Sequence, residues 1–534
     1  MKLLLSALAS VFLTFGFATD PYPRNDALDI QHYVFRLELN DSTNRLAGEA
    51  SITILFKKST SSFELDLVDK STRGFGMTVS NVLSDSKDLV FSHQGSRLKI
   101  SLATPAHVGE LRTLAIRYAG IPQDGLIISN NKFGDRTFFG DNWPDRGHHW
   151  LPCIDHPSDK ATVEFVIVAP DKYNVVASGR KQEESSLPHD QKVTRYTEHI
   201  PIAVKVMAIG VARFAVEETI EVDHIPQSTW VYLQNREAGF HDFAVGTKIF
   251  EYFHRNIGPY SYEKLAHVQS KTRWGGLENA GNIFYTESSV TGKNQHEGLI
   301  AHETAHQWFG NSVTEDDWHH VWLSEGFATY FAALYVEHAY GEVRFAEEMN
   351  KDREEVTTHY VVDKRPIVDT TIVTLGDVLS TNTYQKAGWV LHMLRQKIGD
   401  DAFWKGIRKY YATYQNKNAL TADFRRIMEE ASGTDLKPFF NQWLYRGGHP
   451  QLSVTWAFDK TSSKIAISVG QQQPLPFQFP LEVLLRLPDG KTVRQTFQVT
   501  SGNERFSMKA VAKPAEMELD PDCKLLYEAE IQGR

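Results

Sequence analysis

Residues 299–310 read LIAHETAHQWFG, and the two histidines in this stretch decide which kind of domain surrounds them. His302 and His306 are four positions apart, and Glu303 directly follows the first of them. On a helix of about 3.6 residues per turn, positions four apart share a face, so both imidazoles can reach one metal ion. The pattern His-Glu-x-x-His also arises by chance on polar helix surfaces. Its meaning therefore depends on the rest of the sequence.

A third metal ligand is found further along the chain. Eighteen residues separate His306 from Glu325, which lies in the stretch WLSEGFATYF. This interval accommodates a helix end, a polar loop and a second, antiparallel helix that returns the carboxylate to the imidazoles. A different zinc-protease pattern needs Gly and His three and six residues after the second histidine. Phe309 and Ser312 stand there, which excludes that pattern.

Two imidazoles and one carboxylate leave a tetrahedral zinc with one open position for water, which is the layout of a catalytic site. Such an ion acidifies its water and polarises a carbonyl. Glu303 is then placed to take the proton from the water and deliver it to a leaving amine. His319 and His320 remain alternative ligands to Glu325 on residue type alone. The sequence predicts one bound Zn²⁺.

The stretch WGGLENAGN (274–282) is a candidate substrate-binding segment. Gly275 and Gly276 allow unusual backbone angles and a close approach of a ligand to the main chain. A strand edge here can pair with an extended peptide while the Glu278 carboxylate holds a substrate ammonium. Taken alone, the same letters also describe a plain turn. A phosphate-binding loop is disfavoured because neither GxGxxG nor a P-loop lysine is present.

The remaining chain divides into three regions by its pattern. Residues 24–215 alternate apolar and polar residues, as in YVFRLELN (33–40), and predict an antiparallel β-rich domain. Residues 216–446 have helical spacing with glycines near the predicted helix ends, including one helix over 238–258. Residues 447–534 return to strands and predict a β-sandwich, with a hairpin around Pro488-Asp489-Gly490. The fold class is therefore multidomain α+β.

Composition and the N-terminus limit the partners. A net charge of -9 over 534 residues argues against nucleic acid or an anionic membrane as the main partner. Residues 1–18 have a lysine, an apolar run and a small-residue cleavage site, and predict a signal peptide of a secreted or periplasmic protein. The run is short for a membrane span of about 20 residues, so stable membrane insertion is not expected. The two cysteines, Cys153 and Cys523, are too few for a Cys-based zinc site, and their pairing is left open.

From roughly residue 30 to residue 530, the sequence resembles the zinc aminopeptidase family of aminopeptidase N and leukotriene epoxide hydrolase. The matching segments are GGLEN (275–279) for the family's Gly-x-Met-Glu-Asn, HETAHQWFGNSVT (302–314), WLSEGFATY (322–330), LPCIDHPSDKA (151–161), YQKA (384–387) for Tyr-x-Lys-Gly, and DLKPFFNQWLYRGGHP (435–450). The resemblance implies an N-terminal β-saddle domain, a thermolysin-like catalytic domain and a C-terminal β-sandwich. A large helical C-terminal domain is not expected, which predicts an open cleft.

The resemblance also implies a role for each matching residue. Zinc is bound by His302, His306 and Glu325, and Glu303 is general base and acid. Tyr384 donates a hydrogen bond to the oxyanion. The implied substrate-binding residues are Gly275, Gly276, Leu277, Glu278 and Asn279, with Glu278 holding the free α-amine.

The family places a second amine-binding Gln or Glu before its Pro-Cys motif. Here Asp141 and Trp143 stand at the two corresponding positions. Asp141 can replace the missing anion, and Trp143 is a pocket wall or part of the core. Two further departures are Leu277 for methionine and Ser324 for asparagine before the third ligand.

The resulting prediction is a zinc aminopeptidase that removes single residues from peptides with a free N-terminus. An endopeptidase needs no amine anchor, so Glu278 speaks against it. An epoxide hydrolase would share the zinc site. A zinc-bearing peptide-binding protein without turnover is the non-enzymatic alternative, and the retained Glu303 and Tyr384 speak against it.

Overall fold

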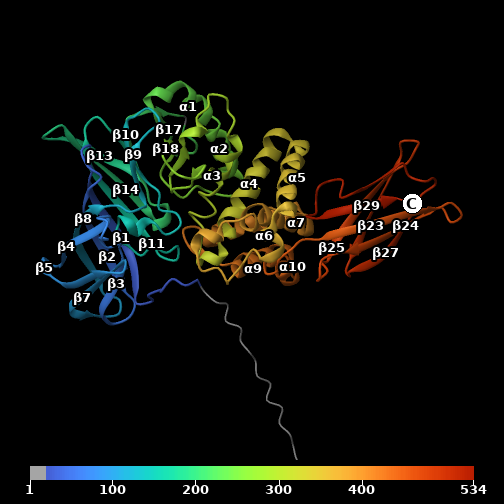
Figure 1. The fold of residues 1–534 in the computed structure, drawn as a ribbon, viewed down its shortest axis with the longest axis horizontal. Helices are drawn as coiled ribbons and strands as arrows, with labels where there is room; N and C mark the ends of the chain where they lie inside the picture. The colour runs from blue at the N-terminus through green and yellow to red at the C-terminus, as the bar shows by residue number, and fades with distance from the viewer. Residues whose placement is uncertain (1–19, 220, 534) are drawn as a thin grey trace, which may run out of the picture.

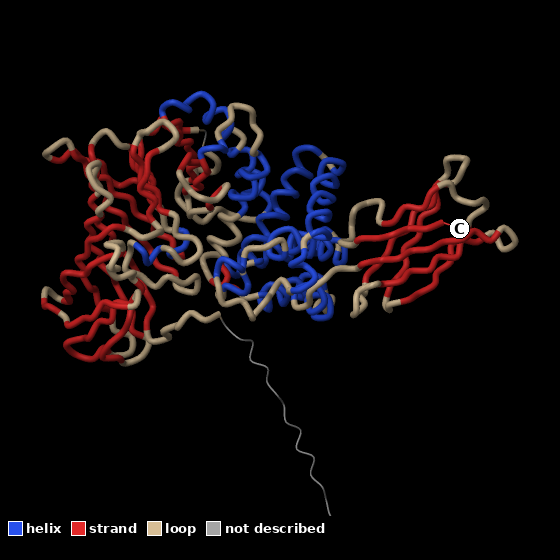
Figure 2. Tube along the Cα trace, viewed as in Figure 1, coloured by secondary structure: helices blue, strands red, loops and turns tan. Residues whose placement is uncertain are grey.

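The computed structural model describes residues 20–219 and 221–533. The predicted signal peptide, residues 1–18, lies outside this range. Figure 1 shows three regions in chain order along the long axis: strands in blue, helices in green to yellow, and strands in orange to red. The same division is visible by element type in Figure 2. The predicted multidomain α+β class is confirmed.

The N-terminal region is built around one large sheet. Its strand β1 pairs antiparallel with β2 and parallel with β11. The alternation read from the sequence is present, since Tyr33, Phe35 and Leu37 are fully buried on one face of β1. In sheet order the strands are β13 (Arg180–Leu187), β14 (Gln191–Ala203), β11 (Lys160–Pro170), β1 (Leu28–Glu38), β2 (Leu46–Phe56), β8 (Leu111–Ile121), β4 (Gly76–Ser84) and β5 (Lys87–Asp88).

Two smaller sheets complete the N-terminal region. One contains β12 (Asn174–Ala177), β15 (Ile209–Ala212), β10 (Arg136–Gly140) and β9 (Leu126–Asn130). The other contains β3 (Thr60–Asp66), β7 (Arg97–Ala106) and β6 (Val90–Gln94). Cys153, in this region, and Cys523, in the C-terminal region, are both buried and do not form a disulfide.

The middle region starts with a sheet whose last strand borders the functional site. Its order is β16 (Phe214–Glu218), β17 (Gln227–Tyr232), β18 (Leu265–Ser270), β20 (Asn282–Thr286) and β19 (Gly276–Leu277). The strand β16 spans the predicted domain boundary at residue 215 and pairs with β17. Because β19 pairs only with β20 in this sheet, its other edge is open to an added strand.

Helices pack beside this sheet and contain the metal-ligand motif. They are α1 (Arg236–Phe243), α2 (Gly246–Asn256), α3 (Glu297–Ala305), α4 (Trp322–Tyr340), α5 (Glu342–Thr358), α6 (Tyr360–Lys364), α7 (Ala387–Ile398), α8 (Asp400–Tyr414), α9 (Thr421–Ser432) and α10 (Lys437–Leu444). Two short strands, β21 (Thr314–Glu315) and β22 (Asn418–Ala419), pair between them. Among the described helices, none combines the length and apolar character that a membrane crossing requires.

The single helix predicted over residues 238–258 is in fact two, α1 and α2, which meet at residues 244–245. Gly246 begins α2 and packs closely on His267, because a Cβ there would lie 2.3 Å from the ring nitrogen. Glycine is a poor helix former, so the residue that permits the close contact with His267 also favours a helix break at this position. The prediction of one helix was wrong because the spacing of apolar residues carries no information about the contact between Gly246 and His267.

The C-terminal region consists of two sheets that bury their apolar residues in one core. One contains β27 (Asn503–Lys509), β24 (Lys464–Gln471), β23 (Gln451–Asp459) and β29 (Glu528–Gly533), and the other β26 (Thr492–Val499), β25 (Phe479–Arg486) and β28 (Glu516–Leu519). The predicted hairpin is formed by β25 and β26. Gly490 in its turn has φ +83°, a left-handed angle that glycine adopts at little cost.

Two lysines of the N-terminal region hold the loop between α3 and α4. Lys160 donates from Nζ to the carbonyl oxygens of Asn311, at 3.1 Å, and Ser312, at 2.7 Å. Lys205 forms an ion pair with Glu315, and both side chains are almost completely buried. Since this loop joins the two helices that carry the metal ligands, the N-terminal region helps to fix their relative position.

We expect a Lys205→Met substitution to destabilise the protein by about 3–5 kcal/mol, because Glu315 is left as a buried, unpaired charge. Adding Glu315→Leu should recover most of this loss, since an apolar pair replaces the ion pair. Urea denaturation of the native protein, the single variant and the double variant measures both effects. A double variant as unstable as the single one would contradict the assigned cause.

Candidate active site

The helices α3 and α4 bring the three predicted metal ligands together. His302 lies on α3, His306 immediately follows its last residue, and Glu325 lies in the first turn of α4. The two Nε2 atoms are 3.1 Å apart. Glu325 Oε2 lies 3.4 Å from Nε2 of His302 and 3.2 Å from Nε2 of His306. The three side chains therefore direct one donor atom each at a common point.

This spacing fits a zinc ion. Ligand atoms about 2.0–2.2 Å from a tetrahedral zinc lie roughly 3.3–3.6 Å from one another, close to the observed distances. His306 Nδ1 lies 3.2 Å from the carbonyl oxygen of Phe309. A carbonyl accepts only, so Nδ1 donates and the Nε2 lone pair is left for a metal.

The charges of the site also favour a bound cation. Burial opposes protonation of His306, but Glu325 and Glu278 outweigh it and raise the pKa of the imidazole to about 10. Burial raises the pKa of the Glu303 carboxyl well above its ordinary value, and Glu278 and Glu325 add to this rise. Three carboxyl groups thus share one buried space, and a dication would offset their mutual repulsion.

Ser324 takes part in orienting the second histidine ligand. Its Oγ lies 3.1 Å from His306 Nδ1, on the side away from the metal-binding nitrogen. Gly310 is needed next to it, because a Cβ at this position would lie 2.2 Å from Ser324 Oγ. Ser324, which replaces the family's asparagine before the third ligand, therefore contacts the His306 ring on the side opposite the metal-binding nitrogen.

The Glu303 carboxyl lies against Gly276 of the edge strand β19. A Cβ at Gly276 would come within 2.4 Å of the Glu303 carboxyl carbon, so only glycine permits this approach. The carboxyl is thus held between α3 and the segment that a peptide backbone can pair with. Gly275, Gly276 and Glu303 line the same cavity.

Glu278 is buried, yet its Oε1 has no hydrogen-bond partner among the described residues. Its backbone oxygen accepts from Nε2 of Gln307, at 3.0 Å, and from Nδ2 of Asn311. These contacts clamp the strand segment to the end of α3 and leave the carboxylate facing the cavity that it lines. A buried acceptor without a partner costs free energy unless a ligand supplies the donor.

Tyr384 lies on a single π-helical turn, Asn382–Lys386, that precedes α7. The amide of Lys386 donates to the carbonyl of Thr381, five residues earlier, at 2.9 Å. Gly326 lets this turn approach α4, because a Cβ there would lie 2.5 Å from that of Ala387. The Tyr384 ring stacks beside His302 with centroids 5.9 Å apart. The tyrosine is thus placed at the ligand cluster, and such turns are frequent at functional sites.

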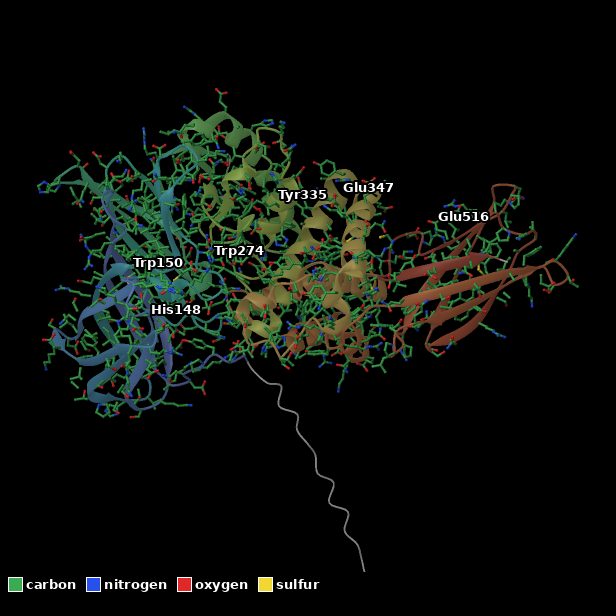
Figure 3. All side chains as sticks on the ribbon, in the orientation of Figure 1. His148, Trp150, Trp274, Tyr335, Glu347 and Glu516 are labelled. Carbon is green, nitrogen blue, oxygen red and sulfur yellow. The ribbon has the colours of Figure 1, made fainter. Side chains whose placement is uncertain are left out.

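These groups line one cavity of about 560 Å³. Trp274, labelled in Figure 3, marks its place between the N-terminal strands and the helices of the middle region. The lining residues are Trp143, Trp274, Gly275, Gly276, Leu277, Glu278, Leu299, His302, Glu303, His306, Glu325, Lys351, Leu379, Tyr384 and Gln385.

Two predicted substrate-binding residues do not line this cavity. Asp141 is fully buried, is ion-paired with Arg146 and accepts from Oγ1 of Thr272 at 3.1 Å. Its carboxylate is already used, so the expectation that it anchors an amine was wrong. Asn279 is also fully buried and contributes its backbone oxygen to Gln307.

His319 and His320, the alternative metal ligands, point elsewhere. Nε2 of His319 lies 3.1 Å from the carbonyl oxygen of Ile372, and Nδ1 of His320 lies 2.7 Å from Oγ1 of Thr421.

The sequence did not identify some of the residues that line the cavity. Leu299 lies one helical turn before His302 and Glu303, so helical spacing would have found it. Lys351 and Leu379 come from other segments of the chain and carry no local signal. Trp143 was predicted as either a pocket wall or core, and it is both: it lines the cavity and packs in an apolar cluster.

Comparison with known proteins gives a consistent match. The family model described as the Peptidase family M1 domain matches residues 241–443, and the Peptidase M1 N-terminal domain matches residues 30–203. Together these matches include the ligand helices and the strand segment at the cavity. Both models belong to the same family, in the order expected along one chain.

Two curated relatives are similar over most of this chain. Glutamyl aminopeptidase of Homo sapiens is 28% identical over 389 residues, which are 68% of this chain and 40% of that protein. Probable aminopeptidase 2 of Sulfurisphaera tokodaii is 27% identical over 402 residues, 71% of this chain and 50% of that protein. The chain thus spans half or less of the length of these relatives.

A solved structure shows the same fold. A mutant M1 zinc metallopeptidase from Deinococcus radiodurans, crystallised with a Tyr-Ser-Ala substrate, has a TM-score of 0.70 and 22% sequence identity. The match covers 80% of this chain and 96% of that one.

Proposed function

The chain belongs to peptidase family M1, and from this premise we propose that it is a zinc-dependent aminopeptidase that removes single residues from the N-terminus of peptides. The observation that carries the proposal is the Glu278 carboxylate. It is buried in the same cavity as the three metal ligands, with Oε1 lacking a partner. A substrate ammonium is the complementary group, because it brings both charge and hydrogen-bond donors.

Zinc held by His302, His306 and Glu325 would supply a Lewis acid that acidifies water and polarises the scissile carbonyl. Glu278 binds the α-ammonium and so sets how far the peptide enters. The edge of β19 orients the backbone through main-chain hydrogen bonds.

The proton transfers fall to the chain's own carboxyl group. Glu303 takes a proton from the attacking water and passes it to the nitrogen of the departing peptide. Tyr384 donates its hydroxyl hydrogen to the oxygen that gains negative charge, a contribution worth about 10²–10³ in rate for a single donor. Burial raises the pKa of the Tyr384 hydroxyl well above its ordinary value, so it remains a donor at neutral pH.

Glu278 also separates this proposal from its main competitors. An endopeptidase must admit chain on both sides of the scissile bond, and a buried carboxylate at one end of the cavity opposes that. An epoxide hydrolase needs no ammonium partner for Glu278. Both relatives described above are named as aminopeptidases, which supports the same reading.

A Glu278→Ala variant should raise KM for free peptides and narrow their advantage over N-acetylated ones by about 10–100-fold, because a charged hydrogen bond contributes roughly 1.5–3 kcal/mol. Rates for a peptide and its acetylated twin, measured side by side, give this ratio. A Glu337→Ala variant is the matched control, since this glutamate is paired with Arg395 outside the cavity. An unchanged ratio in the Glu278 variant would remove the amine-binding role.

We also propose that the protein is exported and acts on peptides outside the cytoplasm, on the basis of the signal-like residues 1–18. Mass analysis of the protein from the extracellular or periplasmic fraction should find a chain that starts close to residue 19. Recovery from the cytoplasm with residues 1–18 still attached would contradict export.

A further inference from the structure

The cavity has an apolar wall beside the amine-binding carboxylate. We propose that this wall makes the enzyme select peptides whose first residue has a large apolar or aromatic side chain, and that Trp143 sets this preference. The inference rests on the proposed aminopeptidase function and names the substrate class of the same site.

The wall is a continuous packed surface. Trp143, Trp274, Leu277 and Leu379 line the cavity and belong to, or pack against, one apolar cluster. The Trp143 ring stands edge-on to the ring of Trp274, with centroids 6.1 Å apart, and to that of Trp318, at 5.5 Å. It is only 3% exposed, so its position is fixed by packing from behind.

The strand segment before Glu278 gives the order of binding positions. A Cβ at Gly275 would contact the Leu299 side chain at 3.7 Å, and one at Gly276 would meet Glu303. Leu277 belongs to the apolar cluster of Trp143, whereas Leu299 packs against a different cluster. Going from Glu278 to Gly275, the cavity therefore passes first the Trp143 wall, then the catalytic carboxyl, then Leu299.

A peptide bound in this order presents its first side chain to the wall. With its ammonium at Glu278 and its scissile carbonyl at the metal ligands, the first residue alone lies between them. The second residue must lie beyond Glu303, which protonates the departing nitrogen, and so toward Gly275 and Leu299. The first side chain is thus the one that contacts Trp143 and Leu277.

The charges around the wall disfavour an acidic first side chain. Arg146, next to Trp143, is already paired with Asp141 and lies 3.7 Å from Asp124. Three carboxyl groups line the cavity, whereas Lys351 is the single lysine or arginine among its described lining residues and is exposed. An acidic side chain would lose its water without gaining a partner in the wall, while an apolar one gains by burial.

The cavity is also large enough for such a side chain. Its volume is about 560 Å³, and Trp143, Trp274 and Leu277 are among its lining residues. Selection by this wall follows from the area that a first side chain buries against it.

The test is a competition among tripeptides X-Gly-Ala, with X as Leu, Phe, Ala or Glu, at equal concentrations. Mass spectrometry follows the loss of X from each peptide. We expect kcat/KM for Leu and Phe to exceed that for Ala and Glu by about 10–100-fold, the range in which apolar pockets discriminate.

Variants assign the preference to the wall. Trp143→Ala should reduce the Leu-to-Ala ratio by about tenfold or more, and Trp143→Phe should retain most of it. If Trp143→Ala does not fold, Leu277→Ala tests the same wall. Trp456→Phe, in β23 of the C-terminal region, is the matched control and should keep the native ratio.

The outcomes separate the two proposals. If no peptide loses its first residue, the proposed function fails, and the inference with it. If single residues are removed but Glu is removed as fast as Leu, only the inference is overturned. Fastest loss of Glu, abolished by Lys351→Met, would show that the rim lysine and not Trp143 selects the substrate.

Discussion

A Glu303→Gln variant should hydrolyse free peptides about 10²–10⁴-fold more slowly than the native enzyme, because its amide cannot take up and return a proton. The effect should appear in kcat rather than in KM, since the substitution changes the proton transfers and not the ammonium contact. Gln is close to Glu in size, so the contact with Gly276 is kept. Steady-state kinetics on zinc-loaded protein measure both parameters.

The variant separates chemistry from metal binding. Glu303 is not among the three grouped ligands, so the zinc content of the variant should match that of the native protein. A Glu297→Gln variant, on the same helix but outside the cavity, is the control and should keep native kcat. A Glu303→Gln enzyme with native kcat would remove this residue from proton transfer.

Removal of the metal is the second large effect. Chelation should reduce hydrolysis to background, and added Zn²⁺ should restore it. At a zinc concentration of about 1,000 times Kd, binding should stabilise the folded protein by roughly 4 kcal/mol. Zinc would also offset the repulsion from neighbouring carboxylates, which adds to burial in raising the pKa values of the Glu278 and Glu303 carboxyls.

A His306→Ala variant shows whether this site is responsible. Its unfolding temperature should no longer rise with zinc, whereas that of Glu303→Gln should rise as in the native protein. Calorimetry with and without zinc makes the comparison without relying on activity. Restoration of activity by zinc in His306→Ala would contradict the assigned ligand set.

Regular periodicity is what made much of the fold predictable. The alternation of Tyr33, Phe35 and Leu37 reports a strand with one buried face, and this face is buried. The ligand spacing was equally informative. Two histidines four positions apart on one helix, followed by a glutamate after 18 intervening residues, are compatible with few geometries. The strand alternation and the ligand spacing involve residues that are close together in the chain, so both can be predicted from the sequence.

The error at Asp141 and the position of Tyr384 depend on side-chain contacts and packing that residue spacing does not show. Asp141 looked available as an anion, but Arg146 and Thr272 use its carboxylate. Tyr384 was identified by the family resemblance alone, and the π-helical turn against α4 brings it to the ligands. Neither set of contacts produces a periodic pattern of residues in the sequence.

The central claim is single-residue cleavage directed by a free amine at a zinc site. Its most direct test is the product mass spectrum of a decapeptide and its N-acetylated twin, incubated with zinc-loaded protein. The account predicts a ladder of products that lose one N-terminal residue at a time, from the free peptide alone. Internal cleavage of both peptides would contradict it.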